Sequence, residues 1–563
     1  MPTTIEVNKQ SVEALLGSGK SKPFVIPEYQ RPYAWTDEQV ETLFEDLWDF
    51  TATSGGTERE SSYFLGSVVS YENEDGEQEI IDGQQRITSL FLLLRAIYTK
   101  LVATPASERT AEANNFIGKI EPTIWRTNKL TGTVDFKNIL LTSRVVNNEG
   151  NEILRSILET GKADEDAKDN YSKNYRHFQE LFDKHSTENP LMVYQFIYAL
   201  LNQAILLPIT ADTQDTALTI FSTLNDRGLP LSDADIFKAK IYNQLAPDDK
   251  KAFIDRWKDL DEQSTDANES IQQLFYYNMF YYRALDKDTK TTTPGVRKYY
   301  AANKFERLYK PELLDTLFVI LNLWKVINKG EELEDEAWSK NIKIRQTLDI
   351  LTSYPNEYWK YPVVIYYVCY RNEENFETRF ARFLNKLLME LMTKYLMIPT
   401  INAVKPDILK LNSAIVVSDI PTFEFKTVDM TQLEPYIQNP NRNVVRMLLK
   451  TLAYEHQDDL LPAKWEIEHI FPQKWQTNYF PDEPDATIKE KIEHIGNKLP
   501  FEKKLNIVAG NGYFGKKKKE YTASKIVITK AMGTSDVMDW NLESITKRDI
   551  RVSDEVIKIM NRW

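Results

Sequence analysis

Residues 465–473 read Trp-Glu-Ile-Glu-His-Ile-Phe-Pro-Gln, and this stretch decides the fold of the C-terminal part of the chain. Isoleucines flank a central Glu-His pair in a short apolar run that ends at Pro472, which predicts a strand. A second apolar run follows Gly496 and Asn497, and residues 503–508 have the pattern of a helix start. The sequence therefore predicts a strand, a loop, a second strand and a helix, in that order.

Glu468 and His469 lie on the first predicted strand, and Asn residues lie on the elements that follow it. Metal-dependent cleavage of a phosphodiester needs a base that deprotonates water and a hard cation that holds the phosphate. His469 suits the base because the pKa of a His lies near neutrality, and Glu468 with an amide oxygen suits Mg²⁺. His494 is a second candidate for the base, although its position favours a surface or DNA-facing residue. A Glu-His pair alone is more often structural, but the spaced Gly-Asn, Asn and Lys residues favour catalysis.

The same residues resemble the HNH (His-Me finger) nucleases, and among them the C-terminal nuclease of the GmrSD type. The matching positions are Glu468, His469, Ile470, Pro472, Gly496, Asn497, Asn506, Gly510, Asn511 and Lys516, with Tyr513 as the aromatic residue before that lysine, and then Tyr521 and Ser524. The resemblance implies a ββα-metal fold in which His469 is the general base and Asn497 orients its ring. It also implies that Glu468 and Asn506 hold Mg²⁺ or Mn²⁺.

A second motif, Asp-Gly-Gln-Gln-Arg, occupies residues 82–86. It follows a predicted hairpin with strands at 63–71 and 79–81, and it precedes a strongly apolar helix at 87–101. Free backbone N–H groups and the helix dipole make such a turn suitable for an anion. Arg86 adds a guanidinium group that can hold a phosphate in a bidentate manner. The alternative is a capped helix start with a structural Arg–Asp pair.

Residues 26–35, Ile-Pro-Glu-Tyr-Gln-Arg-Pro-Tyr-Ala-Trp, and Phe-Leu-Gly-Ser at 64–67 complete the N-terminal pattern. Together these motifs look like the N-terminal domain of the GmrSD-type family, which is similar to ParB and sulfiredoxin folds and is linked to nucleotide binding and hydrolysis. The nucleotide-binding residues that the pattern implies are Gln30, Arg31, Asp82, Gly83, Gln84, Gln85 and Arg86. The resemblance continues through 225–238, where the further candidates are Asn225, Arg227 and Lys238. Asn225 fits a turn better, and Asp235 fits a helix cap.

The composition limits how the chain can contact nucleic acid. Of its 563 residues 42% are hydrophobic and 27% are charged, which is ordinary for a globular protein of two to four domains. The net charge of −13 argues against a uniformly basic nucleic-acid-binding protein, so DNA contacts need local patches. Such a patch is predicted between 491 and 530, where lysines outnumber acidic residues. The predicted DNA-binding lysines are Lys503, Lys504, Lys516, Lys517, Lys518 and Lys519, and the alternative is a solvated face.

The chain has one cysteine, Cys369, so it can form no internal disulfide, and the thiol fits a core position in a reducing cytoplasm. The N-terminal residues lack the basic start and apolar core of a signal peptide. No apolar run reaches the roughly 18 residues that a membrane span needs. We therefore expect a cytoplasmic protein without a membrane partner.

The middle of the chain carries no chemical motif. Residues 271–282 and 376–396 have the pattern of helices, and their aromatic residues fit a core better than a base-stacking surface. The stretch 399–428 fits a boundary before the C-terminal part.

These observations predict an α+β, mostly helical multidomain protein. The expected parts are a ParB/sulfiredoxin-like nucleotide-binding domain with a helical insert at 1–245, a helical connector at 246–425 and an HNH nuclease at 426–563. The resemblance implies a type IV restriction endonuclease with a nucleoside triphosphate site and NTPase activity, and it favours a homodimer. Its expected substrate is double-stranded, base-modified phage DNA, such as DNA with glucosylated hydroxymethylcytosine.

Two alternatives to this function stay open. One is a nuclease that senses phosphorothioate or other backbone marks, or that is blind to modification. The other is a nucleotide-switched DNA-binding protein whose nuclease is inactive. The intact set of His, Glu and Asn residues argues against the second alternative.

Overall fold

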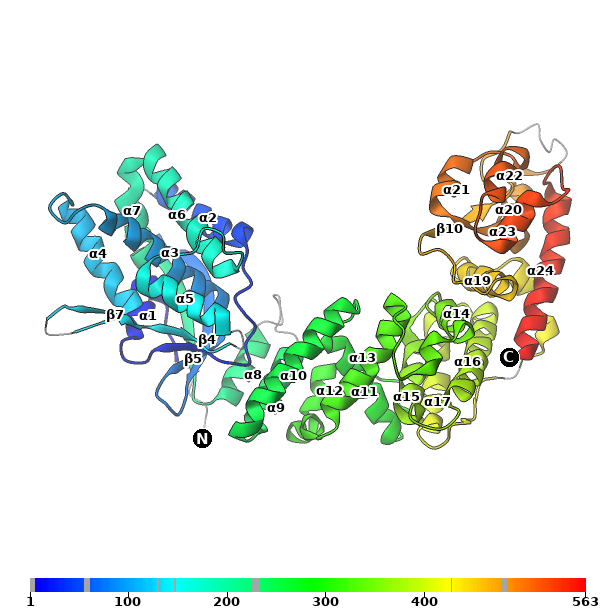
Figure 1. The fold of residues 1–563 in the computed structure, drawn as a ribbon, viewed down its shortest axis with the longest axis horizontal. Coiled ribbons are helices and arrows are strands. Elements are labelled where there is room, and N and C mark those ends of the chain that lie inside the picture. The colour runs from blue at the N-terminus through cyan, green and yellow to red at the C-terminus, as the bar shows by residue number, and fades with distance from the viewer. Residues whose placement is uncertain are drawn as a thin grey trace. The chain divides into compact units, whose positions relative to one another are not determined.

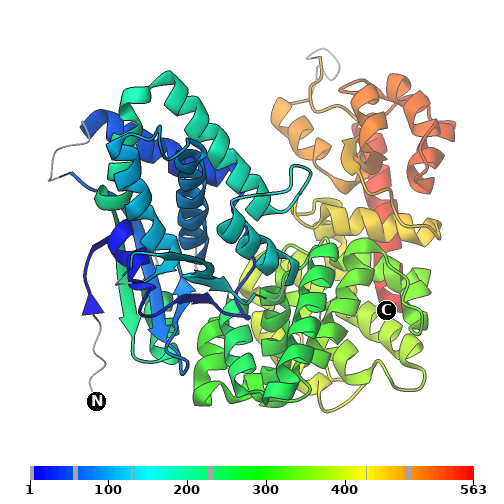
Figure 2. The same cartoon turned by 60° about the vertical axis from the view of Figure 1, so that its left-hand side comes forward.

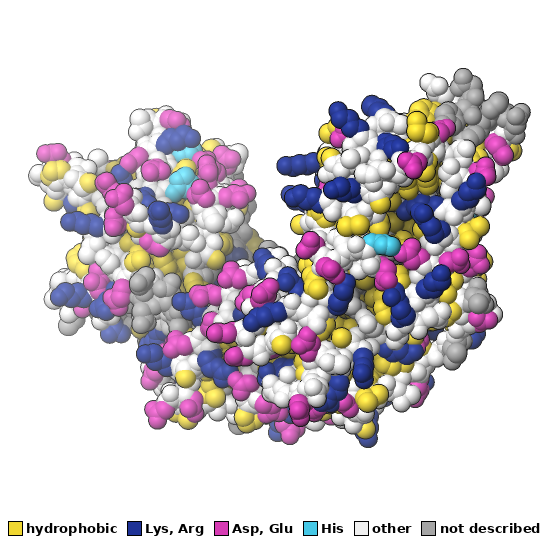
Figure 3. Space-filling model, turned by 45° about the vertical axis from the view of Figure 1, so that its right-hand side comes forward, with side chains coloured by type: hydrophobic (Ala, Val, Ile, Leu, Met, Phe, Trp, Pro, Cys, Tyr) yellow, Lys and Arg dark blue, Asp and Glu magenta, His cyan; other side chains and the backbone are white. Residues whose placement is uncertain are grey.

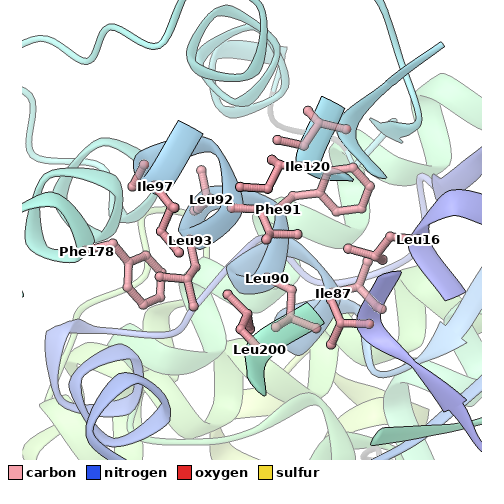
Figure 4. Packing of buried hydrophobic residues seen from close by; sticks show 14 of the residues in the cluster. Leu16, Ile87, Leu90, Phe91, Leu92, Leu93, Ile97, Ile120, Phe178 and Leu200 are labelled. Carbon is pink, nitrogen blue, oxygen red and sulfur yellow. The ribbon is translucent and has the colours of Figure 1, made fainter. Parts of the chain in front are cut away.

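The core of the N-terminal part forms around the apolar helix that follows the 82–86 motif. In the computed structural model this helix, α3 (Gln84–Ala103), is buried along most of its length. Figure 4 shows Leu90, Phe91 and Leu93 of α3 packed among side chains from other elements. A helix that is apolar all round is stable only inside a core, so α3 organises the elements around it. The predicted helix at 87–101 is confirmed.

The structure describes residues 6–54, 61–128, 131–145, 148–224, 233–426, 428–476 and 483–563. The chain divides into two compact units, 1–257 and 258–563, which are both drawn in Figure 1. Unit 1 contains the large sheet and the N-terminal motifs, and unit 2 contains a helical part and the stretch around 465–506. The division into three domains stays a prediction. Across the described ranges, we find no helix with the length and apolar character to cross a membrane.

Unit 1 is built on a mixed sheet of seven strands in the order β1-β9-β4-β5-β3-β8, with β2 beside β9. The strands are β1 (Glu6–Val7), β2 (Gln10–Ser11), β3 (Phe24–Ile26), β4 (Tyr63–Glu72), β5 (Gln78–Asp82), β8 (Leu141–Ser143) and β9 (Ala204–Ala211). β4 and β5 form the predicted antiparallel hairpin. Because β5 also pairs with β3, the strand that ends at Asp82 lies inside the sheet. A separate pair, β6 (Trp125–Thr127) and β7 (Val134–Ile139), lies outside it.

Helices cover both faces of the large sheet (Figures 1 and 2). Val68 and Ile80 belong to the core that surrounds α3, whereas Val69 and Ile81 belong to a second core, as the alternation along a strand requires. The first core also takes residues from α1 (Val12–Ser18), α2 (Asp37–Ser54), α4 (Ala111–Ile124), α5 (Asn148–Thr160), α6 (Asn170–Glu188) and α7 (Val193–Tyr198). The second core takes residues from α8 (Gln214–Leu224) and α9 (Asp233–Gln244).

The first part of unit 2 is helical. Its longer helices are α11 (Ile271–Leu285), α13 (Leu313–Lys329), α14 (Ile342–Leu351), α15 (Lys360–Tyr370), α16 (Phe376–Met397), α17 (Lys405–Ile415) and α19 (Val445–His456). The predicted helices at 271–282 and 376–396 are confirmed, and stacked pairs such as Tyr277 with Trp324 show that the aromatic residues form core. The stretch 399–428 is no plain boundary, because it contains α17, which packs against α11 and α15.

The C-terminal part has the predicted order of strand, loop, strand and helix. β10 (Trp465–His469) pairs antiparallel with β11 (Lys498–Glu502), and α21 (Lys503–Ala509) follows directly. The other helices here are α20 (Asp485–Ile492), α22 (Phe514–Thr522), α23 (Val527–Thr534) and α24 (Leu542–Arg562). They enclose a core that includes Ile470, Phe501 and Tyr521.

Candidate functional site

The first strand of the C-terminal hairpin is anchored at its start. The guanidinium group of Arg446, on α19, stacks 4.0 Å from the centre of the Trp465 ring and donates to the Trp465 carbonyl. From this anchor β10 runs through Glu468, which is opposite Leu499, to His469, which is opposite Lys498. The register therefore places the Glu-His pair at the end of the strand, where the loop at 470–476 begins.

The side chain of Glu468 is buried in a charged contact. Its Oε1 atom is 2.7 Å from Nζ of Lys517 and accepts a hydrogen bond of 2.6 Å from the hydroxyl group of Tyr521. Lys517 also donates to the main-chain carbonyl of His469. Burial lowers the pKa of Lys517 and, with the Glu468 charge, raises the pKa of Tyr521. α22 therefore holds the carboxylate from the interior.

His469 lies at the edge of the core, with 16% of its side chain exposed. Its Nε2 atom is 3.4 Å from Oε1 of Glu493 and 3.4 Å from the side-chain amide of Gln473. Burial lowers the pKa of His469; the Glu493 charge opposes this effect, and the charges of Lys498 and Lys517 add to it. The net shift favours the neutral ring, which is the form that can accept a proton.

Asn497 is fully buried and acts on the main chain around His469 rather than on its ring. Its side-chain amide donates to the carbonyls of Phe471 and Ile492, and its oxygen accepts from the Phe471 N–H. These bonds use both amide hydrogens. Asn497 was predicted to orient the ring; the structure shows that it fixes the loop that follows His469, so any effect on the ring passes through the backbone.

The turn before β11 is locked onto α24. A Cβ atom on Gly496 would lie 2.3 Å from the Ile545 carbonyl oxygen, so only glycine fits there. The N–H group of Gly496 donates to Oδ1 of Asp549 over 2.7 Å. Arg548, which is buried, donates to the carbonyls of residues 495, 496 and 498. Gly496 therefore lets the turn lie close to α24, and Asn497 holds the loop after His469 in place.

His494 belongs to the same support, because it is paired with the carboxylate of Asp549. Its Nδ1 atom is 2.7 Å from Oδ2 of Asp549, and Lys491 contacts the same carboxylate oxygen over 3.0 Å. The side chains of His494 and Asp549 are 13% and 1% exposed. The prediction of a surface position for His494 is wrong, because the residue pairs with a carboxylate that sequence spacing did not reveal.

Asn506 lies on α21, which packs against β10. Its side-chain amide donates to Oε2 of Glu466 over 3.0 Å. Within the described ranges, neither Oδ1 of Asn506 nor Oε2 of Glu468 has a hydrogen-bond partner. A carboxylate and an amide oxygen are the ligand types that Mg²⁺ takes, so the donor chemistry fits the predicted metal. The described part of the chain holds no group of three His, Cys, Asp or Glu residues arranged for a metal.

The structure disagrees with two predictions for the lysines at 516–519, namely which lysine belongs to the motif and which lysines can bind DNA. Phe514, two intervening residues and Lys517 reproduce the aromatic-x-x-Lys spacing, and Lys517 contacts Glu468, so the motif lysine is Lys517 and not Lys516. Lys517 is also buried and is excluded as a DNA-binding residue. Lys518 is partly buried and donates to a main-chain carbonyl.

Of the predicted DNA-binding lysines, the exposed ones are Lys503, Lys504, Lys516 and Lys519. Lys503 is 3.5 Å from Glu466 and keeps more than half of its side chain exposed. Figure 3 shows that basic side chains project from the part of the molecule that contains this site, whereas acidic and basic side chains intermingle over much of the rest of the visible face. The four exposed lysines remain candidates for phosphate contacts.

The N-terminal motif has the predicted strand, glycine turn and helix. β5 ends at Asp82, Gly83 has a positive φ of 89°, and α3 begins at Gln84. The guanidinium group of Arg86 lies against Gly66, where a Cβ atom would be only 2.9 Å from it, and donates to the Ser67 carbonyl. Gly66 of the Phe-Leu-Gly-Ser motif has a φ of 114°, which favours glycine, and its lack of a side chain leaves room for the guanidinium group of Arg86.

Three glutamines of the N-terminal motifs hold the two motif segments together. Gln30 donates to the Ile81 carbonyl, and Gln84 donates to Gln30 and to the Arg31 carbonyl. Gln85 accepts from the N–H groups of residues 34 and 35 and donates to the residue 32 carbonyl. All three are buried. They were predicted as ligand contacts, but the structure uses them as clamps between residues 30–35 and the start of α3.

The charged residues of the motif are better placed for a ligand. Arg31 is exposed, whereas Asp82 and Arg86 are partly buried. Burial raises the pKa of Asp82 against the opposing charges of Arg86 and Arg31, and burial lowers the pKa of Arg86. Asn225 and Arg227 lie outside the described residues. Asp235 lies in the first turn of α9, as expected for a cap.

Sequence reasoning missed several residues of the C-terminal site. Glu493 and Arg548 contact His469 or the turn from elements that carry no recognisable motif, and Lys498, which directly follows the Gly-Asn pair, lies opposite His469. Lys517 alone had a usable signal, because its spacing from Phe514 fits the motif.

Comparisons with known proteins match both parts of the chain to one family. A family model described as the N-terminal domain of the GmrSD restriction endonuclease matches residues 12–242, which include the sheet of unit 1 and its motifs. A model described as the C-terminal domain of GmrSD restriction endonucleases matches residues 429–552, which include β10, β11 and α21. A search of curated proteins finds no match.

Proposed function

The chain belongs to the GmrSD restriction endonucleases, and we propose that it cuts DNA as a metal-dependent nuclease of the HNH type. The observation that carries the proposal is the β10–β11–α21 arrangement. It places Glu468 and His469 at the end of one strand and Asn506 on the helix that follows its partner strand. The same chain region matches the C-terminal family model.

His469 is the proposed general base. It accepts a proton from the water molecule that attacks the phosphorus atom, and its lowered pKa keeps the ring neutral and able to do so near neutral pH. Asn497 and the Arg548–Asp549 pair keep the loop and turn around it rigid. Glu468 and Asn506 would hold Mg²⁺ or Mn²⁺, which stabilises charge on the phosphate and the leaving oxygen.

The proposed DNA contacts are electrostatic. Lys503 and Lys504 begin α21, and Lys516 and Lys519 lie on α22, so exposed ammonium groups flank the strand that carries Glu468 and His469. Contacts of this kind position a duplex without reading its sequence. Base-modified phage DNA is the proposed substrate.

A nucleoside triphosphate is the proposed ligand of unit 1. Gly83 leaves the first N–H groups of the 20-residue helix α3 without a side-chain cap, which suits a phosphate. Arg31 and Arg86 add positive charge beside that turn, and the three glutamine clamps fix the segment that carries Arg31. We propose that this site binds and hydrolyses nucleotide and thereby regulates cleavage.

The decisive experiment compares cleavage of matched phage DNAs, plain and glucosylated, with and without nucleoside triphosphates, in Mg²⁺ or excess EDTA. We expect cleavage of modified DNA that requires the metal and responds to nucleotide. The His469→Ala protein should fold and bind DNA but lose a factor of about 10²–10⁴ in rate. Full cleavage in EDTA or by His469→Ala would refute the assignment. DNA binding without any cleavage would favour a nucleotide-switched binding protein.

A further inference from the structure

The ammonium group of Lys517 connects the two residues of the Glu-His pair. Its Nζ atom is 2.7 Å from Oε1 of Glu468 and 2.5 Å from the main-chain oxygen of His469. The Lys517 side chain is 2% exposed and that of Glu468 is 6% exposed. Buried charges are tolerated when they are paired and hydrogen-bonded, so this contact fixes both groups in one geometry.

Tyr521 holds the same carboxylate oxygen. It lies four residues after Lys517 on α22, so both side chains reach the same side of that helix. Its hydroxyl group donates to Oε1 of Glu468 over 2.6 Å. The closest approach of Lys517 and the hydrogen bond of Tyr521 are therefore both to Oε1, and within the described ranges no residue donates a hydrogen bond to Oε2.

We propose that Lys517 and Tyr521 are a positioning pair that fixes Glu468 through Oε1 and leaves Oε2 for a divalent cation. We further propose that the charge of Lys517 keeps the free site's affinity for that cation low until a DNA phosphate joins it. This inference rests on the proposed metal-dependent function. It assigns no proton transfer to either residue.

The charge of Lys517 opposes the binding of a cation at Oε2 of Glu468. The Lys517 ammonium already balances the Glu468 charge, so a divalent cation at Oε2 meets a neutral pair rather than a free carboxylate. Charges of +1 and +2 separated by about 5 Å oppose each other strongly enough, even with the dielectric of water, to weaken binding roughly tenfold. A DNA phosphate adds the missing negative charge. Metal and DNA should therefore strengthen each other's binding, and by the same factor.

The chain contains a matched control for the loss of a buried lysine. Lys450 and Tyr454 on α19 have the same spacing and both contact the carboxylate of Asp349, over 2.9 Å and 2.5 Å. The Lys450 side chain is 7% exposed. This triad joins α14 to α19, and its lysine contacts Asp349 rather than Glu468, so its loss should affect folding without removing a charge from the proposed cation site.

The first experiment measures Mn²⁺ binding to the full chain by calorimetry, without DNA. The site-specific signal is the part that Glu468→Gln abolishes. We expect Lys517→Met to bind Mn²⁺ about tenfold more tightly than the wild type and to cut DNA more slowly. Lys450→Met should keep the wild-type affinity. Tyr521→Phe keeps the charge but loses a donor, so it should cut more slowly without binding Mn²⁺ more tightly.

Lys517→Gln provides a second neutral variant if Lys517→Met does not fold. A folded neutral variant that binds Mn²⁺ no more tightly than the wild type would overturn the proposal. The second experiment needs neither variant and uses His469→Ala, which should cut far more slowly than the wild type. A modified duplex should raise its Mn²⁺ affinity, and an unchanged affinity would overturn the proposal. Metal-independent cleavage, or no cleavage at all, would instead reject the proposed function itself.

Discussion

At the scale of single residues, the surroundings of His469 set the pH range in which it can act as a base. Burial lowers its pKa below the ordinary value of about 6.5. The Glu493 carboxylate, 3.4 Å away, works in the opposite direction because it favours the charged ring. The ring is therefore held neutral by burial and by neighbouring lysines, and Glu493 limits that effect.

We predict that the acidic limb of the cleavage rate has its midpoint below pH 6.5. The neutral ring is the active form, so activity is present above the pKa of His469 and is lost as the pH falls through it. Glu493→Gln removes a charge that raises this pKa, so the limb should move to lower pH. Rates measured under single-turnover conditions between pH 5 and 8 test both statements, and a limb that moves upward would contradict them.

A site residue was predictable from the sequence where the spacing of a motif alone identifies it. Glu468 and His469 lie where the pattern placed them, but the motif lysine was assigned to Lys516 although Lys517 makes the contact. By contrast, the role of the glutamines at 30, 84 and 85 could not be predicted from the sequence. An amide fits a ligand and a backbone clamp equally well, and only the position of residues 30–35 beside α3 decides between them.

At the scale of elements, the hairpin and helix at 465–509 were predictable because their apolar runs and turn residues are local signals. The contribution of α24 was not, because Arg548 and Asp549 contact the turn from about 50 residues away in the sequence. Nothing in their own neighbourhood marks them as partners of Gly496. Long-range support of this kind follows from packing, which single-sequence patterns do not encode.

We predict that Gly496→Ala lowers both stability and activity. The new Cβ atom would lie 2.3 Å from the Ile545 carbonyl oxygen, so α24 or the turn must move. Overpacking of this kind costs about 1–3 kcal/mol in the free energy of unfolding. Gly515→Ala on α22 is the control, because no atom lies within 4 Å of its added Cβ. Equal melting temperatures and rates for the two variants would disprove the close approach.

At the scale of the whole molecule, the charge of −13 means that DNA must bind where positive charge is concentrated locally. We predict that alanine at Lys503, Lys504, Lys516 and Lys519 together weakens binding to all DNA sequences. The slope of log affinity against log salt should fall by roughly 0.9 for each phosphate that the variant no longer neutralises. Alanine at four exposed lysines elsewhere, Lys162, Lys184, Lys251 and Lys287, is the control. An unchanged slope would show that these four lysines form a solvated face and do not contact phosphates.

The division of the chain into units was only partly predictable. Length and composition indicated several domains, and the structure divides into two units between residues 257 and 258; the three domains at 1–245, 246–425 and 426–563 stay a prediction. Within unit 2, residues of the expected connector (246–425) contact residues of the expected nuclease (426–563): Lys450 contacts Asp349, and Asn443 donates to Tyr395. Such contacts join the expected connector and nuclease, and the sequence between them gave no sign of this.

Control of one unit by the other is testable at Arg31. Arg86 is a poor choice for mutation, because it contacts Ser67 and lies against Gly66, so its loss would disturb the fold. Arg31 is exposed, and its side chain has no hydrogen bond among the described residues, so Arg31→Ala should keep the melting temperature. Arg155→Ala, at an exposed arginine of α5, is the control.

We predict that Arg31→Ala weakens nucleotide binding, measured by calorimetry, at least several-fold, because the variant lacks a charge that faces the phosphate site. DNA cleavage should change as well, although residues 465–509 are untouched, since a ligand that binds one unit can alter the other only through a coupling free energy between the two sites. That coupling must also appear in reverse, so DNA should change the nucleotide affinity of the wild type by the same factor that nucleotide changes its DNA affinity. Normal nucleotide binding by Arg31→Ala would remove Arg31 from the site. Weakened nucleotide binding with unchanged cleavage, at every nucleotide concentration tested, would show that the two units act independently.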